Sequence, residues 1–521
     1  FERHYVNNSN TPTKFIKVLF HLWTAVKNLL SLSNIAIIII SGLLGTLAGA
    51  MPGISASAIT AIFIPFTVWL PADIAIVALI ALYASATYGG SITAILYRIP
   101  GAPTSVMTAI DGYEMTKKGR SGEALMLARF YSLLGGLVGG LFILFMTPLF
   151  VDIAIMFRSQ EIFALIIMAL AFLATFEGGV KALLSAFFGF FLATIGQDPL
   201  TGIFRFTFDI PLMGGGLGIV PVFLGLFAVS EILRLMEGEL HPFIVSERYS
   251  TRELLAPSWN FFKRSAPLIF TIAIPIGFLI GVLPGVGATT AAVVSYTIAK
   301  GISKRSEEWG KGIPEGVAVP EAANNAAAMG TLVLTLTLGI PGGATAALIL
   351  GALIMHGATP GRYIFKDNPL LGYTILLGAV ISNIIFYVVA PVIIYLFVKI
   401  GEFLRRNIPQ MAVLIIFFSI IGTYVIRNSV FDSATVLVLG IIGYLMSKCK
   451  IPLGPAAITF VLGPIAEKYF RRALDISRGD LTTFISSPIS ILIYVLTLAL
   501  ILLPRIYIRM RQGKDYSEKA D

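Results

Sequence analysis

Residues 268–289 read LIFTIAIPIGFLIGVLPGVGAT, an uncharged apolar stretch that ends around a Pro-Gly pair. A helix of this length matches the hydrocarbon thickness of a bilayer. Similar runs lie at Ile35–Ala50, Ile162–Thr175, Ile375–Val398 and Ile489–Leu503. Because these runs are solidly apolar rather than alternating, they indicate helices and not a membrane barrel. The sequence therefore predicts an all-α polytopic membrane protein with about a dozen transmembrane segments.

The composition excludes most soluble classes. Hydrophobic residues make up 56% of the 521 positions and charged residues 13%, whereas soluble domains carry about 25% charged residues. The net charge of +10 would also suit nucleic-acid binding, but here the cations stand at the ends of apolar runs. Under the positive-inside rule we expect cytoplasmic loops at Lys300–Lys311, Arg405–Arg406, Lys448–Lys450, Arg471–Arg472 and Arg505–Lys514.

No catalytic or metal-binding pattern stands out. The single cysteine, Cys449, allows no internal disulfide, and His4, His21, His241 and His356 lack the spacing of a metal site. No nucleophile–base set and no phosphate-binding loop is present. We therefore expect no enzyme, no catalytic residues, no metal ligands and no cofactor.

A polar connector at 237–264 divides the chain near its middle. We expect a first membrane repeat at 34–236, a second repeat with C-terminal helices at 265–505, and a basic cytoplasmic tail at 506–521. Within 1–33, the apolar stretch 15–31 contains Lys17, His21 and Lys27. That mixture is typical of a helix that lies in the membrane interface.

Two Pro-Gly pairs recur in the same order in both halves. Pro284-Gly285 follows Pro52-Gly53 by 232 residues, and Pro341-Gly342 follows Pro100-Gly101 by 241 residues. The recurrence predicts pseudo-symmetric halves with broken helices, although chance repetition in a glycine-rich chain is an alternative. Residues 68–73 contain no Lys or Arg, whereas the matching loop 300–311 contains four. This difference favours inverted halves.

The breaks themselves predict an anion site. Pro and Gly end a helix inside the membrane, and the next half-helix then directs its free N–H groups at a cavity. Simple helix kinks are the alternative. The candidate carboxylate-binding residues at the breaks are Pro52, Gly53, Ser55, Ser57, Pro284, Gly285, Gly287 and Thr289.

Two further segments supply polar candidates. In residues 88–93, Gly89, Gly90, Ser91 and Thr93 would admit a ligand and bind a carboxylate or sodium, or would form a tight helix contact. Ionisable residues within membrane segments usually serve function, so we expect Asn324 and Asn325 to bind substrate, and Glu321 and Asn324 to serve ion coupling. The alternative places Glu321 in a loop and Asn324 at a helix cap.

Longer motifs accompany these candidates, namely YGGSITAI at 88–95, DGYEM at 111–115, GQDPLTG at 196–202, RFTF at 205–208 and PEAANNA at 320–326. From about residue 34 to 470, the chain resembles the large membrane (permease) subunit of the tripartite tricarboxylate transporters. Two positions depart from the expected pattern, with Arg98 where Asn is usual and Asp209 where Gly is usual. These departures put the identity of the substrate in doubt.

The resemblance implies secondary transport, in which a sodium or proton gradient drives symport of organic acids such as citrate and other di- and tricarboxylates. It also implies a small membrane subunit and a periplasmic solute-binding protein as partners, and a location in the inner (cytoplasmic) membrane. A channel or a membrane-embedded enzyme without binding-protein dependence is the alternative.

Overall fold

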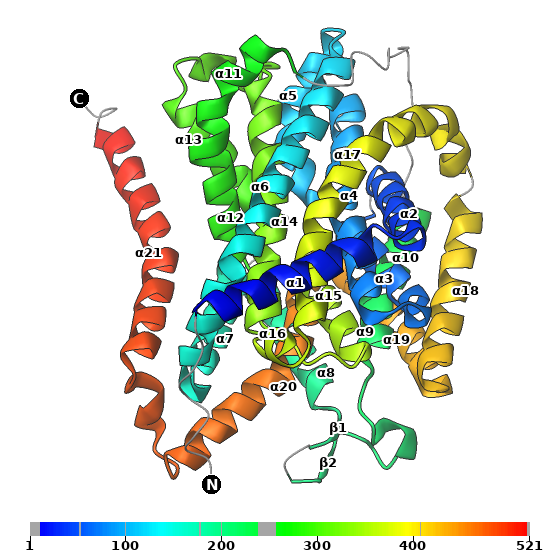
Figure 1. Cartoon of the computed structure of the whole chain (residues 1–521), viewed down its shortest axis with the longest axis vertical. Coiled ribbons are helices and arrows are strands. Elements are labelled where there is room, and N and C mark those ends of the chain that lie inside the picture. Colours follow the sequence, from blue (N-terminus) through cyan, green and yellow to red (C-terminus); the bar gives the residue numbers. More distant parts are fainter. Residues whose placement is uncertain are drawn as a thin grey trace.

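The computed structural model describes residues 11–51, 54–98, 100–176, 179–198, 201–237, 257–406 and 408–517. Within these residues the protein is an all-α bundle (Figure 1). Its described strands, β1 (Gly196–Gln197) and β2 (Phe204–Arg205), form a short antiparallel pair. Pro52, Gly53 and positions 238–256 of the predicted connector lie outside the described residues.

The helices are interrupted at Pro100-Gly101, Pro284-Gly285 and Pro341-Gly342, and one helix ends at Gly49 and the next begins at Ala56 on either side of the remaining predicted position. The first half contains α2 (Leu32–Gly49), α3 (Ala56–Phe63), α4 (Ala72–Tyr97) and α5 (Val106–Lys117). The second half contains α12 (Ile274–Val282), α13 (Gly287–Ile302), α14 (Glu315–Thr337) and α15 (Ala344–Met355). Between α12 and α13, Gly285 and Gly287 have φ angles of +80° and +75°. Glycine adopts these angles without steric penalty, which explains why the helix stops there.

The other helices complete the bundle. They are α1 (Thr11–Leu29), α6 (Ser121–Met156), α7 (Ser159–Phe176), α8 (Val180–Thr194), α9 (Ile219–Phe223), α10 (Ser230–Glu237), α11 (Trp259–Leu268), α16 (Tyr363–Asp367), α17 (Pro369–Arg406), α18 (Ile408–Arg427), α19 (Val430–Lys448), α20 (Leu453–Ile476) and α21 (Pro488–Ser517). Helix α21 continues to Ser517 and so includes much of the segment 506–521, whose role as a basic cytoplasmic tail stays a prediction.

Six helices of the described chain are long and apolar enough to cross a membrane. They are Leu32–Gly49, Ala72–Tyr97, Ser121–Met156, Trp259–Val282, Pro369–Tyr395 and Val430–Lys448. The remaining apolar helices, among them α7, α8 and α15, are shorter. The figure of about a dozen spans therefore stays a prediction.

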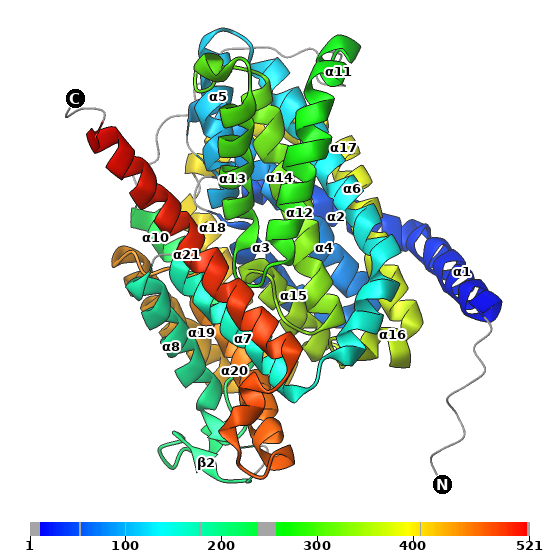
Figure 2. The ribbon, with the colours of Figure 1, turned by 90° about the vertical axis from the view of Figure 1, so that its left-hand side faces the viewer.

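The helices form two groups that pack side by side. The first group consists of the interrupted helices with α6 and α17, and α14 lies at its centre. The second group contains α7, α8, α19, α20 and α21 and lies beside the first (Figure 2). Helix α1 crosses the outside of the bundle against α17 (Figure 1). Its Leu19, Phe20 and Trp23 are exposed. The position of α1 in the membrane interface stays a prediction.

The two halves pack their broken helices in the same register. A Cβ atom on Gly49 of α2 would lie 2.3 Å from the carbonyl oxygen of Ala86 in α4. In the second half, a Cβ on Gly281 of α12 would lie 2.2 Å from the carbonyl oxygen of Ala327 in α14. Gly281 follows Gly49 by 232 residues and Ala327 follows Ala86 by 241 residues, the offsets that relate the Pro-Gly pairs. Small residues allow this close backbone approach.

Helices α4 and α14 run in opposite directions. The segment that leads into α4 lies next to the end of α15, where Thr67 Oγ1 and His356 Nε2 are 3.1 Å apart. The loop that leads into α14 lies next to the end of α5, where Lys118 Nζ donates to the Lys311 carbonyl at 2.5 Å. Each helix therefore begins at the end of the bundle where the other finishes.

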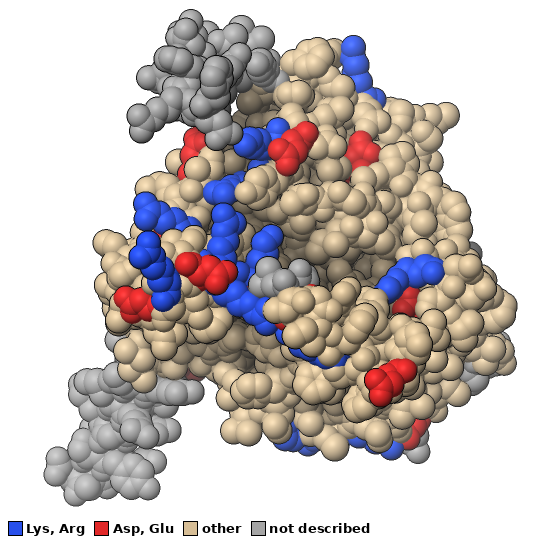
Figure 3. Space-filling model, turned by 90° about the horizontal axis from the view of Figure 1, so that it is seen from below, with Lys and Arg blue, Asp and Glu red and all other residues tan. Residues whose placement is uncertain are grey.

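The basic clusters do not share one end of the molecule. The loop at Lys300–Lys311 follows α13 at the top of Figure 1, whereas Arg471–Arg472 lies near the end of α20 at the bottom. Lys and Arg also gather in the middle of this lower face (Figure 3). The cytoplasmic position of the individual basic clusters therefore stays a prediction. Arg471 forms ion pairs with Asp198 at 2.9 Å and Glu467 at 2.5 Å.

Candidate functional site

A cavity of about 750 Å³ lies where the broken helices meet the second helix group. Its first wall consists of residues that follow helix breaks, namely Ser55, Ser57, Pro100, Gly101, Ala102, Pro103, Val106 and Ala344. Its second wall comes from Phe227, Glu231, Arg234, Ser447 and the segment Lys450–Gly454. The cavity thus contains two of the predicted site residues, Ser55 and Ser57, and part of the predicted break at Pro100-Gly101.

Three helix N-termini reach this cavity. Ser55 is the N-cap of α3 and accepts a hydrogen bond from the backbone N–H of Ala58 at 3.1 Å. Val106 and Ala344 are the first residues of α5 and α15. The first and fourth breaks also touch, since Thr345 Oγ1 lies 3.5 Å from Ser57 Oγ. Free N–H groups and aligned dipoles at helix N-termini favour an anion in this space.

The opposite wall carries charges that we did not predict from the sequence. Arg234 forms an ion pair with Glu231 at 2.5 Å. Lys450 forms no ion pair among the residues that the structure describes. Its φ angle of +56° directs the chain from α19 into α20 beside the cavity. In the sequence Lys450 belongs to a basic cluster of the kind that sets membrane orientation, so no local signal identifies it as a residue of the cavity.

The third break supports the site without lining the cavity. The backbone N–H of Gly285 donates to the Gly342 carbonyl at 3.1 Å, and a Cβ on Gly343 would lie 3.8 Å from the Gly287 Cα. Pro284 and Thr289 are likewise absent from the cavity lining. Among the described residues, therefore, this break contacts the fourth break rather than the cavity.

Gly89 and Gly90 lie in close helix contacts. A Cβ on Gly89 would lie 2.4 Å from the Thr46 carbonyl oxygen, and one on Gly90 would lie 2.8 Å from Ser105 Oγ. Thr93 Oγ1 donates to the Gly90 carbonyl at 3.4 Å. These contacts match the tight-packing alternative considered for this motif, and ligand binding by these residues stays a prediction.

Glu321, Asn324 and Asn325 lie within α14 and are fully buried. This placement excludes the alternative of a loop glutamate and a capping asparagine. Asn325 donates to Asn324 Oδ1 at 2.7 Å, and Asn324 donates to the Thr104 carbonyl at 3.4 Å. Neither asparagine lines the cavity. Both amides thus connect α14 to the second break, whose residues Pro100–Pro103 do line it.

Three hydroxyl groups donate hydrogen bonds to the carboxyl group of Glu321. Ser91 Oγ and Thr108 Oγ1 donate to its Oε1, both at 2.5 Å, and Ser132 Oγ donates to its Oε2 at 2.7 Å. Only Ser91 was a predicted site residue. Thr108 and Ser132 lie 213 and 189 residues from Glu321 in the sequence, so no local pattern marks them.

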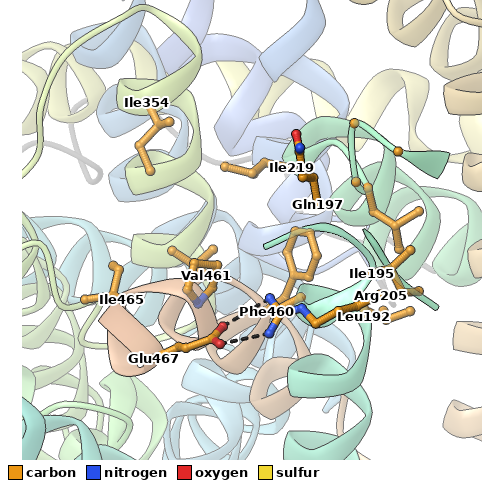
Figure 4. A pocket seen from close by; sticks show the side chains of 16 residues that line it. Leu192, Ile195, Gln197, Arg205, Ile219, Ile354, Phe460, Val461, Ile465 and Glu467 are labelled. Carbon is orange, nitrogen blue, oxygen red and sulfur yellow. Dashed lines mark hydrogen bonds and ion pairs between the residues drawn. The ribbon is translucent and has the colours of Figure 1, made fainter. Parts of the chain in front are cut away.

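A second cavity of about 570 Å³ lies near the lower end of the molecule (Figure 4). Residues of α8, the β1–β2 segment, α9 and α20 line it. Figure 4 shows Arg205 directed at Glu467, with Arg205 Nη1 and Glu467 Oε1 2.8 Å apart. Because Arg205 already has an acidic partner, we expect this second cavity to bind an anion less strongly than the first cavity, which Lys450 lines.

The two departures from the family pattern lie at left-handed backbone positions. Arg98 and Asp209 both have φ angles of +58°. Asn and Gly adopt this conformation most readily, which explains why these residue types suit the two positions. The guanidinium of Arg98 lies 5.9 Å from the centre of the Tyr113 ring, so it contacts an aromatic side chain rather than the cavity.

Interrupted helices, a buried polar centre and several long apolar helices are the features of a polytopic membrane protein, and the cavity at the breaks is its candidate ligand site. The chain belongs to the tripartite tricarboxylate transporter TctA family, whose sequence profile matches residues 35–458. The resemblance inferred from the motifs is thereby confirmed. It places the protein among the large membrane subunits of tripartite transport systems rather than among enzymes.

The chain is also similar to two proteins of Agrobacterium vitis. One is described as an uncharacterized 52.8 kDa protein in the TAR-I ttuC' 3' region and is 37% identical over 493 residues, covering 93% of this chain and 96% of that protein. The other, an uncharacterized protein in the TAR-II ttuC' 3' region, is 41% identical over 216 residues, covering 41% of this chain and 87% of that protein. No solved structure matches the chain.

Proposed function

We propose that this protein is the large membrane subunit of a secondary, ion-gradient-driven transporter that takes up di- and tricarboxylates such as citrate. A periplasmic solute-binding protein delivers the substrate and a small membrane subunit assists. The family assignment supports the tripartite organisation. The observation that carries the proposal is the cavity of about 750 Å³, which is lined by three helix N-termini, by Lys450 and by the ion pair of Arg234 with Glu231. A polyanion gains from helix N-termini and from cations.

The proposed architecture is an inverted repeat. The matching glycine contacts and the opposite directions of α4 and α14 support it. Inversion brings helix N-termini from both halves to one internal site, here those of α3, α5 and α15. We propose that the end of the bundle with the Lys300–Lys311 loop lies on the cytoplasmic side of the inner membrane, because that loop carries four cations.

The test is substrate counterflow. Purified protein, together with any subunits that co-purify, is reconstituted in liposomes preloaded with unlabelled citrate, and radiolabelled citrate is added outside. A transporter concentrates the label transiently without a gradient, whereas a channel only equilibrates it and an enzyme converts it. Failure of a panel of di- and tricarboxylates to give counterflow, with and without the binding protein, would contradict the proposal.

A further inference from the structure

Glu321 is a buried carboxyl group that joins the two halves of the chain. It belongs to α14 in the second half, while its donors Ser91, Thr108 and Ser132 belong to α4, α5 and α6 in the first half. Its relative exposure is 0%. All three donors are uncharged hydroxyl groups, so they stabilise a carboxylate by hydrogen bonding but supply no positive charge to neutralise it.

The charged groups around Glu321 have other partners. On α6, Arg129 lies 4.3 Å from the centre of the Tyr387 ring and donates to the Tyr387 carbonyl at 3.4 Å. On α14, Glu315 forms ion pairs with Arg264 at 3.0 Å and Arg305 at 3.5 Å.

The remaining titratable neighbours are acidic or neutral. On α5, Asp111 accepts hydrogen bonds from the Tyr296 hydroxyl and the 310–313 loop. On α4, Tyr88 contributes a buried, neutral phenol. On α17, Asn383 is buried and Tyr387 is the aromatic partner of Arg129. Among the described residues, no Lys, Arg or His forms an ion pair with Glu321.

A buried carboxylate without a cationic partner is strongly disfavoured as an anion. Binding of one proton removes that charge. Hydroxyl groups act equally as donors and as acceptors, so Ser91, Thr108 and Ser132 accommodate either form of the carboxyl group by rotating their O–H bonds. The site is therefore suited to take up and release a proton without rebuilding its packing.

The same hydroxyls connect Glu321 to the cavity. Ser91 Oγ also bonds Ser105 Oγ at 3.1 Å. Ser105 ends the short turn Pro103–Ser105, whose first residue lines the cavity. Rotation of the Ser91 hydroxyl changes its contact with Ser105. A change in the protonation of Glu321 can therefore affect the second break through the side chain of Ser91.

We propose that Glu321 is the proton-carrying group of this transporter, and that one proton binds to its carboxylate with the substrate and is released on the other side. The inference rests on the proposed function, since it names the coupling ion and its site. It assigns to Glu321 a role in coupling and not in contact with the substrate.

The test compares exchange with accumulation in the reconstituted protein. Glu321→Gln keeps the shape of the protonated acid but carries no exchangeable acidic proton. We expect its citrate counterflow to stay within about twofold of the wild type, because exchange needs no net proton movement. Accumulation driven by an inward proton gradient of one pH unit, about tenfold for one proton per substrate, should be lost. Glu315→Gln, the matched control on α14, should keep both activities.

Two results would overturn the inference and leave the proposed function intact. They are normal proton-driven accumulation by Glu321→Gln, and wild-type accumulation that follows a sodium gradient and ignores pH. Absence of wild-type counterflow with every carboxylate would instead contradict the proposed function. If Glu321→Gln fails to fold, proton uptake on citrate binding is measured for the wild type in weakly buffered detergent. One proton per substrate is expected, and none would refute the inference.

Discussion

The carboxylate of Asp111 in α5 accepts the backbone N–H of Gly312 at 2.8 Å. The same oxygen accepts the N–H groups of Gly310 and Ile313, and Tyr296 donates to the other oxygen. One buried side chain of the first half thus fixes the loop that begins α14 in the second half. From the sequence, Asp111 reads only as part of a family motif.

Replacing Asp111 with Ala should destabilise the protein strongly, because it leaves several loop N–H groups without an acceptor. At about 1–3 kcal/mol for each buried unsatisfied group, the melting temperature in detergent should fall by at least about 5 °C. Glu114→Ala is the control, because its surface ion pair with Lys117 contributes less than about 1 kcal/mol. Equal melting temperatures for both variants would contradict this role of Asp111.

Gly49→Ala and Gly281→Ala should each lower stability by about 1–3 kcal/mol. The added Cβ atoms would lie 2.3 Å and 2.2 Å from carbonyl oxygens of the neighbouring helices, so α2 and α12 must move outward. Gly301→Ala in α13 has nothing within 4 Å of its Cβ and should be neutral or slightly stabilising. Thermal unfolding of the three purified variants measures the difference. A large effect in only one half would argue against equivalent packing.

Lys450→Met should weaken citrate binding about tenfold, or ~1.4 kcal/mol. The substitution keeps most of the side-chain volume and removes a cation from the cavity wall. Lys448→Met is the matched control, since Lys448 pairs with Glu237 at 2.8 Å and does not line the cavity. Binding to the purified protein is measured at low and high salt, and the difference should shrink as salt screens the charge. Unchanged affinity in Lys450→Met would remove this cation from the site.

The two basic ends should face opposite sides of the membrane. In a Cys449→Ser background, Glu307→Cys near the Lys300–Lys311 cluster and Ser486→Cys beyond α20 provide two exposed thiols. An impermeant maleimide added to intact cells should label position 486, and position 307 only after the membrane is opened. Labelling of both positions from one side would contradict this topology.

Local chemistry explains which parts of the site were predictable. Pro and Gly set the backbone wherever they stand, so the interruptions around Pro100 and Pro284 could be predicted from residue type alone. Polar residues in an apolar segment also stand out, which drew attention to Glu321 and Asn324.

Partners that come from distant parts of the sequence could not be predicted. Glu321 meets Ser132 only because α6 packs against α14, and Arg234 reaches the cavity only through the packing of α10 beside α19. The same limit applies to Arg471, whose acidic partner Asp198 lies 273 residues away. From the sequence alone, a cation that forms an ion pair in the fold cannot be distinguished from a cation that sets the orientation of the protein in the membrane.

Every residue of α14 except Leu334 is buried. Although its 23 residues would cross a bilayer, it is not among the helices apolar enough to do so by themselves. During biosynthesis α14 would therefore not be stable alone in lipid, because Glu321 and the two asparagines would lack partners there. It has to enter the membrane with neighbouring helices already in place. The residues that make the centre of this protein polar thus also set an order for its assembly.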